Sequence, residues 1–168
     1  SMFGDLLTDL EGLSLPPARW QQQALYAMVD AIRLKESTYK SAGSVHACAL
    51  FHNSDMRLFV EDVGRHNAID TIAGWMSMQD SPAVSAANKV FYTTGRLTSE
   101  MVIKSAQMGV PIVISRSGIT QMGHQVAQAV GLCAIGRATN RRFVCYTQPR
   151  RLQLQPDLLQ QFAGRAAI

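Results

Sequence analysis

Two apolar runs in the second half of the chain, each followed by a helix-like segment, constrain the fold most strongly. "KVFYTT" (89–94) and "VPIVISRS" (110–117) are short and β-branched, which is typical of strands buried on both faces. Each leads into an amphipathic segment that begins near a threonine, Thr98 or Thr120, and ends at a glycine. With a third strand at "LCAIGRA" (132–138), this alternation predicts parallel strands joined by right-handed crossovers.

The first half adds a helix and a hairpin to this pattern. Apolar residues at helical spacing predict a helix from Pro16 to about Lys40. Two strands, Val45–Phe51 and Met56–Glu61, flank the turn "HNSD", and a short helix follows over Asn67–Met78. A last strand at "RRFVCYT" (141–147) completes a mixed sheet, so we expect a layered α/β fold.

The 168 residues fit one domain of ordinary size. Ser1-Met2 resembles a cloning scar, so we expect the natural chain to begin earlier. We interpret residues 3–42 as a helical lead-in, 43–147 as the α/β core and 148–168 as a C-terminal tail.

Composition indicates a globular protein rather than a disordered or membrane-spanning one. Hydrophobic residues make up 47% and charged residues 17%, which also favours a substantial interface such as that of a dimer. The net charge is +4, and basic residues gather toward the C-terminal end. A nucleic-acid surface, a solvated basic face and a pocket for a phosphorylated ligand all fit that charge. No apolar run reaches membrane-spanning length, and no signal peptide is recognisable.

The cysteines exclude two classes of small protein. There are three, Cys48, Cys133 and Cys145, and none forms a Cys-x-x-Cys pair. This pattern argues against a disulfide scaffold and against a zinc ribbon, and it favours a reducing compartment. We predict no metal site.

Three strand-to-helix junctions concentrate the polar chemistry. They read "EDVGRHN" (61–67), "TTGRLTSE" (93–100) and "SRSGITQ" (115–121), and they carry Arg65, Arg96 and Arg116. Helix N-termini offer free N–H groups, and arginine forks match phosphate oxygens, so the junctions predict a pocket for an anionic, nucleotide-like ligand. The alternative is that these hydroxyls are ordinary helix caps.

His46, Cys48 and His66 are candidates for chemistry. His46 and Cys48 are two residues apart on one strand and share a face, which suggests a nucleophile and a base. A buried cysteine is more often an inert apolar group, and a strand histidine is more often structural. His66 precedes a helix and is better placed to face a ligand.

Several motifs resemble the FdhD family of formate dehydrogenase accessory proteins. They are "EDVGRHNAID", "TTGRLTSEMVIKSAQMGVPIVISRSGIT" and "FVCYT", in order between about Gly43 and Tyr146. The resemblance implies a three-layer α/β/α fold with a mixed sheet, similar to cytidine deaminases, and a cytoplasmic homodimer. It further implies a sulfurtransferase-like carrier that moves sulfur from a cysteine desulfurase to the molybdenum cofactor. That cofactor, bis-molybdopterin guanine dinucleotide, then enters formate dehydrogenase. No zinc, nucleic-acid or membrane partner is implied.

The resemblance also implies a set of cofactor-binding residues, for which GDP is a surrogate ligand. They are Arg65, His66, Asn67, Thr94, Gly95, Arg96, Ser99, Glu100, Ser115, Arg116, Ser117, Arg137, Ala138, Thr139, Asn140, Arg141 and Arg142.

The sequence departs from the family pattern at several points. The family's "TGG" before the strand histidine reads "AGS" at Ala42–Ser44, and the usual aromatic and glycine pair of the last segment is replaced around Arg137, Asn140 and Arg141. The family's sulfur-carrying Cys-x-x-Cys, which lies upstream of the matched part, does not occur here, so we expect the chain by itself to be inactive in sulfur transfer. The deaminase signature of His-x-Glu with a downstream Pro-Cys-x-x-Cys is also missing. Two alternatives stay open: a chaperone that only binds the cofactor, and a small hydrolase that uses His46 and Cys48.

Overall fold

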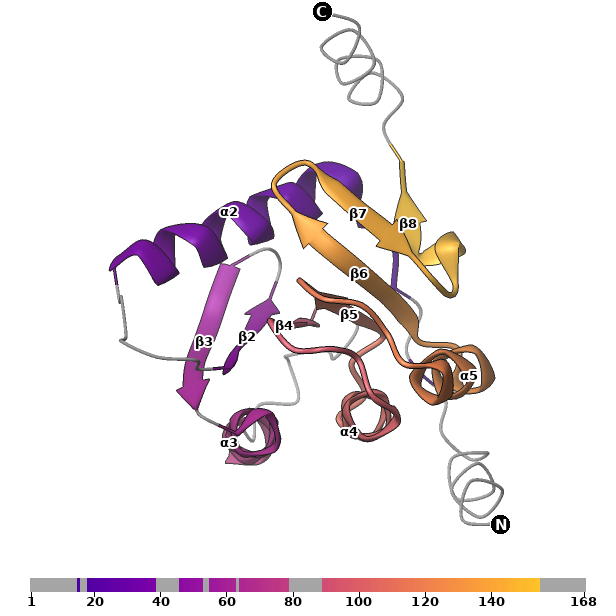
Figure 1. Cartoon of the computed structure of the whole chain (residues 1–168), viewed down its shortest axis with the longest axis horizontal. Coiled ribbons are helices and arrows are strands. Elements are labelled where there is room, and N and C mark those ends of the chain that lie inside the picture. The colour runs from indigo at the N-terminus through magenta and orange to yellow at the C-terminus, as the bar shows by residue number, and fades with distance from the viewer. Residues whose placement is uncertain are drawn as a thin grey trace, which may run out of the picture.

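A six-stranded mixed sheet forms the centre of the protein (Figure 1). The structure is a computed structural model that describes residues 15, 18–38, 46–52, 55–62, 64–78 and 89–154, without the side chains of residues 37, 38, 65, 66, 77 and 78. Its strands lie in the order β3-β2-β4-β5-β6-β7. They are β2 (His46–His52), β3 (Asp55–Asp62), β4 (Lys89–Thr93), β5 (Ile112–Ser115), β6 (Cys133–Thr139) and β7 (Arg142–Cys145).

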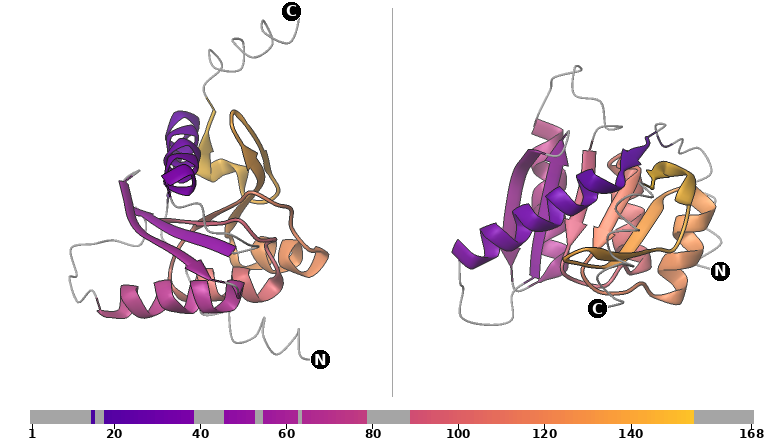
Figure 2. Two further views of the ribbon diagram at one scale, coloured as in Figure 1. Left: turned by 60° about the vertical axis from the view of Figure 1, so that its left-hand side comes forward. Right: turned by 90° about the horizontal axis from the view of Figure 1, so that it is seen from above.

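Helices cover both faces of this sheet, as the two further views show (Figure 2). The longest helix packs on one face, and the other α-helices of the described structure lie side by side on the opposite face. The first is α2 (Gln22–Thr38), and the others are α3 (Arg65–Met78), α4 (Ser99–Gln107) and α5 (Gln121–Val130). The predicted α/β fold with a mixed sheet and three layers is confirmed.

The strand directions agree with the sequence pattern. β4, β5 and β6 run parallel, with α4 and α5 as the crossovers. β2 pairs antiparallel with both β3 and β4, and β7 pairs antiparallel with β6. The helix signals were also correct: Thr98 and Thr120 cap α4 and α5, and Gly131 ends α5 in the left-handed conformation.

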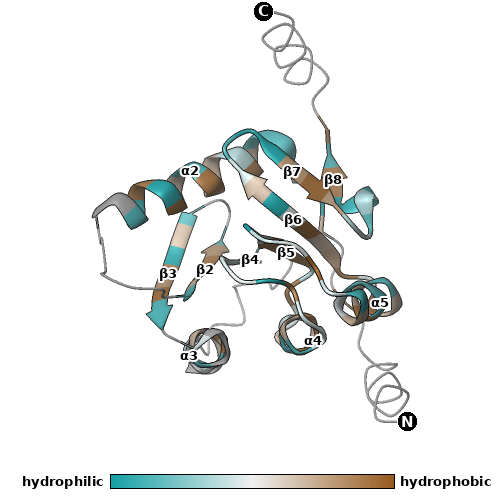
Figure 3. Cartoon of the chain, viewed as in Figure 1, coloured by the Kyte–Doolittle hydropathy of each residue, from teal (hydrophilic) through white to brown (hydrophobic). Residues whose placement is uncertain are grey.

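The core has two halves, one on each face of the sheet. Alternate residues of β4 point to opposite sides of the sheet. Phe91 therefore belongs to the core that includes residues of α3, α4 and α5, whereas Tyr92 belongs to the core that includes residues of α2. All five residues of β4 and all four of β5 are buried. Figure 3 shows the resulting contrast between the apolar inner strands and the mixed outer elements. Burial on both faces explains why the central strands read as uninterrupted apolar runs.

The structure differs from the sequence prediction around the predicted C-terminal tail. A short 3₁₀ helix, η2 (Pro149–Arg151), precedes strand β8 (Leu152–Gln153). β8 pairs in parallel with β1 (Trp20–Gln21), which lies just before α2. Residues 149–153 therefore belong to the fold and not to a tail. Two-residue strands carry no periodic signal, and this pairing joins segments that are remote in sequence.

Candidate functional site

Hydroxyl groups tie together the two loops that follow β4 and β5. Ser115 Oγ donates to the Gly95 carbonyl at 2.6 Å, and Ser117 Oγ donates to the Thr94 carbonyl at 2.8 Å. Within each loop, Thr93 Oγ1 accepts from the Gly95 N–H, and Ser115 Oγ accepts from the Ser117 N–H. The sequence analysis predicted that hydroxyl groups of these loops bind a ligand. In the structure, these hydroxyl groups form hydrogen bonds with the backbone of the loops.

A second set of contacts places the starts of α4 and α5 beside each other. The Leu97 N–H donates to the Gly118 carbonyl at 2.9 Å, and the Thr120 N–H donates to the Leu97 carbonyl at 3.1 Å. A Cβ on Gly123 would lie 2.4 Å from that Leu97 oxygen, so only glycine permits this approach of α5. At the outer side of the loop, Ser99 is half-buried, whereas Arg96 and Glu100 are exposed.

Arg116 extends toward α2. Its guanidinium donates to Glu36 Oε2 at 2.6 Å. Burial opposes the charge of Arg116, but the hydrogen bonds to Glu36 and Tyr92 raise its pKa above the usual range. The pKa of Tyr92 rises to about 12, mainly because its hydroxyl is buried. The Arg116 side chain thus links β5 to α2.

The first junction is fixed by a local turn. Asp62 Oδ1 accepts a hydrogen bond of 2.8 Å from the Gly64 N–H, which leads the chain into α3. Asn67 on the first turn of α3 is exposed. The side chains of Arg65 and His66 lie outside the described structure, so their predicted part in the site stays a prediction.

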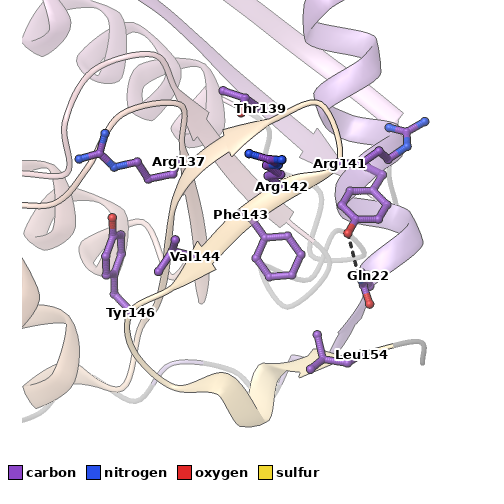
Figure 4. Close-up of a pocket in the computed structure, with 10 residues that line it drawn as sticks. Gln22, Arg137, Thr139, Arg141, Arg142, Phe143, Val144, Tyr146 and Leu154 are labelled. Carbon is purple, nitrogen blue, oxygen red and sulfur yellow. Dashed lines mark hydrogen bonds between the residues drawn. The ribbon is translucent and has the colours of Figure 1, made fainter. Parts of the chain in front are cut away.

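A cavity of about 810 Å³ lies between α2, the β6–β7 hairpin and the end of β8 (Figure 4). Its size falls within the range of small-molecule sites. In Figure 4, Arg141 reaches toward α2, and Arg137 and Tyr146 lie at the other side of the hairpin. The lining residues are Gln22, Tyr26, Arg137, Thr139, Arg141, Arg142, Phe143, Val144, Tyr146 and Leu154.

Ionic and polar contacts fasten the tip of the β6–β7 hairpin to α2. Both terminal nitrogens of Arg141 donate to the Asp30 carboxylate, at 3.0 and 2.9 Å. The Arg141 guanidinium also lies 5.2 Å from the ring centroid of Tyr26. Asn140, whose φ of 51° suits a tight turn, accepts from Arg33 at 3.2 Å. These contacts fix the wall of the cavity that the hairpin provides.

Gly136 and Tyr146 join the cavity to the strand-end loops. A Cβ on Gly136 would lie 2.4 Å from Tyr146 Cε2 and 2.9 Å from the Ser117 carbonyl oxygen. The Arg137 N–H donates to that oxygen at 2.7 Å. A Cβ on Gly118 would lie 3.7 Å from Arg137 Nη2, so this guanidinium lies over the loop after β5.

Arg137 and Arg142 differ from Arg141, the other arginine that lines the cavity, in having no carboxylate partner among the described residues. Both side chains are exposed, and neither has an ion pair or side-chain hydrogen bond among the described residues. By contrast, Arg141 and Arg116 are paired with carboxylates. Within the described part of the chain, the cavity therefore contains two guanidinium groups without a carboxylate partner, and the rings of Phe143 and Tyr146 also line it.

The structure brings only part of the predicted site together. Arg137, Thr139, Arg141 and Arg142 line one cavity. Ala138 is buried in the core on the α2 side, so its side chain faces away from solvent. Thr94, Ser115 and Ser117 stabilise the adjoining loops.

Sequence reasoning missed the residues that complete the cavity, which are Gln22, Tyr26, Phe143, Val144, Tyr146 and Leu154. Tyr26 accepts a hydrogen bond of 2.7 Å from Gln22 and packs near Phe143, with ring centroids 6.1 Å apart. The one signal in the sequence was the aromatic "RRFVCYT" segment beside the arginines. Nothing in the sequence indicated that α2 lies opposite it.

Cys48 lies in an environment that suppresses thiol chemistry. Its side chain is fully buried, and burial raises its pKa to about 11. Its sulfur contacts Thr93 Oγ1 at 3.6 Å. His46, two residues away, is half-buried. This environment favours the interpretation of Cys48 as an apolar core residue.

Fold and cavity together define a three-layer α/β/α protein with a cavity beside its sheet that arginine and aromatic side chains line. The sequence model of the FdhD/NarQ family matches residues 2–153. The chain belongs to the FdhD/NarQ family. Among the described residues, no helix is long and apolar enough to cross a membrane.

Relatives and a solved structure agree with this assignment. The sulfur carrier protein FdhD of Saccharolobus solfataricus is 32% identical over 79% of this chain and 51% of its own length. That of Bacillus subtilis is 34% identical over 78% and 49%. A crystal structure described as a putative formate dehydrogenase accessory protein from Desulfotalea psychrophila matches with a TM-score of 0.76 and 30% identity, over 86% of this chain and 61% of that one. The chain spans about half the length of these curated relatives.

Proposed function

We propose that this chain is the cofactor-binding portion of an FdhD-type sulfur carrier that formate dehydrogenase requires. Sulfur would pass from a cysteine desulfurase to the molybdenum cofactor, as bis-molybdopterin guanine dinucleotide, before the cofactor enters the dehydrogenase. We place this function in the cytoplasm and expect a homodimer. The names of the relatives, sulfur carrier and formate dehydrogenase accessory protein, support the proposal.

One observation carries the binding part of the proposal. Arg137 and Arg142 line the 810 Å³ cavity without a partner among the described residues. Phosphate oxygens match the fork of a guanidinium, and a base can stack on Phe143 or Tyr146. The site therefore suits the guanine nucleotide end of the cofactor.

The cofactor is the cargo of this reaction, and these residues fit its phosphates and base. None of the described residues that line the cavity is a cysteine. The family's Cys-x-x-Cys does not occur in the sequence. We therefore assign binding and orientation of the cofactor to this chain, and we expect it not to transfer sulfur to the cofactor by itself.

Calorimetric titration with GDP, and with cytidine and AMP for comparison, tests the binding site. We expect GDP to bind and Arg137→Ala and Arg142→Ala to weaken it about tenfold or more, because each removes a charge-assisted contact of roughly 1.5–3 kcal/mol. Arg57→Ala, on the exposed face of β3, is the matched control and should bind like the unchanged chain. Higher salt should weaken GDP binding in the unchanged chain.

Two further variants separate the cavity from the strand-end loops. Arg96→Ala and Arg116→Ala remove the arginines that the sequence analysis placed at the ligand. If these two abolish GDP binding while Arg137→Ala and Arg142→Ala do not, the site lies at the loops and not in the cavity. Absence of nucleotide binding by a folded chain would overturn the proposal.

A binding-only cofactor chaperone is the second candidate, and the missing Cys-x-x-Cys favours it. A sulfur carrier and a binding-only chaperone differ in one measurable property. Only the sulfur carrier would hold labile sulfur when the chain is tested together with the family's Cys-x-x-Cys segment. The hydrolase alternative is disfavoured, because it needs a reactive Cys48 and this thiol is buried with a raised pKa.

A further inference from the structure

Two cysteines that the cofactor site does not use face each other across the β6–β7 hairpin. Cys145 is opposite Ile135 in the ladder, and Ile135 is two residues from Cys133 on the same strand. Residues two apart share a face, so both thiols point to the α2 side of the sheet. Their sulfur atoms lie 3.8 Å apart, and both cysteines are unbridged.

The two thiols differ in their access to solvent. Cys133 is fully buried, whereas Cys145 is half-buried. A reagent in solution therefore meets Cys145 first, and Cys133 is positioned to react only after it. This asymmetry is what an attacking thiol and a resolving thiol require.

The surroundings also favour a thiolate at Cys145. The pKa of Cys145 is lowered chiefly by the hydrogen bond from Cys133, although burial opposes this effect. When protonated, the Cys145 thiol donates to the Thr147 carbonyl oxygen at 3.3 Å. The pKa of Cys133 is raised, chiefly by its hydrogen bond to Cys145 and by burial, so this thiol keeps its proton while Cys145 is ionised. The nearby charge of buried Arg151 favours negative charge at the pair.

We propose that Cys133 and Cys145 form a dithiol site that reacts with the sulfur–sulfur bond of a small disulfide or persulfide and closes into a disulfide between β6 and β7. The Cys145 thiolate attacks one sulfur of a disulfide R–S–S–R, the S–S bond breaks, and R–S⁻ leaves with the electron pair. Cys133 then loses its proton to solvent and its sulfur attacks Cys145 Sγ. The second R–S⁻ leaves, so two protein thiols are oxidised and one small disulfide is reduced to two thiols.

A persulfide R–S–SH follows the same route with a different product. Cys145 takes the outer sulfur as R–S⁻ leaves, and Cys133 then displaces hydrosulfide from Cys145. In both cases the two sulfur atoms, which are 3.8 Å apart, must move about 1.8 Å closer together, because a disulfide bond is about 2.05 Å long. The cross-link would join the two strands that carry Arg137 and Arg142, yet its formation needs no bound cofactor.

To test the proposal, the reduced, folded full chain is treated with oxidised glutathione or with glutathione persulfide. Mass spectrometry then measures the mass of the intact chain and identifies cross-linked tryptic peptides. We expect loss of two hydrogens and a cross-link between peptides 117–137 and 143–150. Released hydrosulfide distinguishes the persulfide reaction from the disulfide reaction. Cys48→Ala is the matched control and should cross-link as the unchanged chain does.

Single variants report the order of attack. In Cys133→Ala the reaction should stop with one glutathionyl group, or one extra sulfur, on Cys145. In Cys145→Ala, modification of Cys133 should be at least about tenfold slower, because the buried thiol stays protonated. If a variant does not fold, the cross-linked peptides of the unchanged chain decide the matter. Failure of both reagents to cross-link the folded chain overturns the proposal, as does equal reactivity of Cys145→Ala.

Discussion

At the scale of single residues, the cavity depends on close packing that only glycine allows. Gly136 lets the Tyr146 ring and the Ser117 carbonyl lie against β6, so closely that a Cβ at this position would be 2.4 and 2.9 Å from them. The same approach lets the Arg137 N–H reach Ser117. The lack of a side chain at one position of β6 therefore sets the position of two groups that line the cavity.

We expect Gly136→Ala to displace Tyr146 and lower the free energy of unfolding by about 1–3 kcal/mol, as overpacking does. Gly74→Ala is the control, since a Cβ on Gly74 in α3 would meet nothing within 4 Å and alanine suits a helix better. Urea denaturation of both variants measures the difference. Equal stability of Gly136→Ala and the unchanged chain would contradict the close contact at Tyr146.

At the scale of elements, the two crossover helices start from capping threonines within the hydroxyl-bonded loops. Thr120 Oγ1 accepts from the Gly123 N–H at 3.0 Å, and Thr98 Oγ1 accepts from the Met101 N–H at 3.4 Å. Each cap satisfies a backbone donor that the helix itself leaves unpaired. The alternative to a ligand-binding role, that the hydroxyls at these junctions are ordinary helix caps, is therefore correct for Thr98 and Thr120.

We expect Thr98→Ala and Thr120→Ala each to lower the free energy of unfolding by about 1 kcal/mol, through loss of the cap. The matched control is Thr71→Ala on α3, whose exposed hydroxyl donates to the Asn67 carbonyl one turn earlier. Thermal or urea unfolding with circular dichroism measures all three. A control that loses as much stability as the cap variants would show that capping is not the cause.

At the scale of the whole molecule, contacts between remote segments assemble the cavity. α2 comes from the first quarter of the chain, and the hairpin that it faces comes from the last. The Asp30–Arg141 pair joins them, and the β1–β8 pairing closes the same side of the sheet. The cavity therefore forms only when the two ends of the described chain meet.

The Asp30–Arg141 pair should make stability depend on pH in the acid range. The hydrogen bond from Arg141 lowers the pKa of Asp30 below its ordinary 3.8, against a smaller opposing effect of burial. A lowered folded-state pKa stabilises the fold above the unfolded-state value, and this contribution is lost as pH falls through the folded-state value. Both side chains are more than a third exposed, so the contribution is about 0.2–1 kcal/mol.

Asp30→Asn measures this contribution. Its free energy of unfolding should fall below that of the unchanged chain near neutral pH, and the two should converge at about pH 3 or lower. Glu36→Gln, which removes the carboxylate paired with Arg116, tests whether the effect belongs to the Asp30 pair. A difference that stays constant over this pH range would exclude ionisation of Asp30 as the cause.

The resemblance of several motifs identified the family, and local signals in the amino-acid sequence were enough to predict a layered α/β fold with a mixed sheet and the caps of α4 and α5. These signals are the apolar runs of β4 and β5, Thr98 and Thr120 before a helix, and Gly131 after one. Arginines near strand ends could also be recognised from neighbouring residues. The ion pairs of these arginines could not be predicted from neighbouring residues. Arg116 pairs with Glu36 and Arg141 pairs with Asp30, and both carboxylates belong to α2, which is remote in the sequence.

Long-range packing, in contrast, determines which arginines of the cavity pair with a carboxylate among the described residues and which thiols meet. The carboxylates of α2 pair with Arg116 and Arg141 but not with Arg137 or Arg142. The partner of Arg141 lies 111 positions away in the chain. Cys133 and Cys145 meet because of the register of β6 and β7, which a single-residue slip would change. Such pairings depend on how distant elements pack together, and local residue patterns do not encode them.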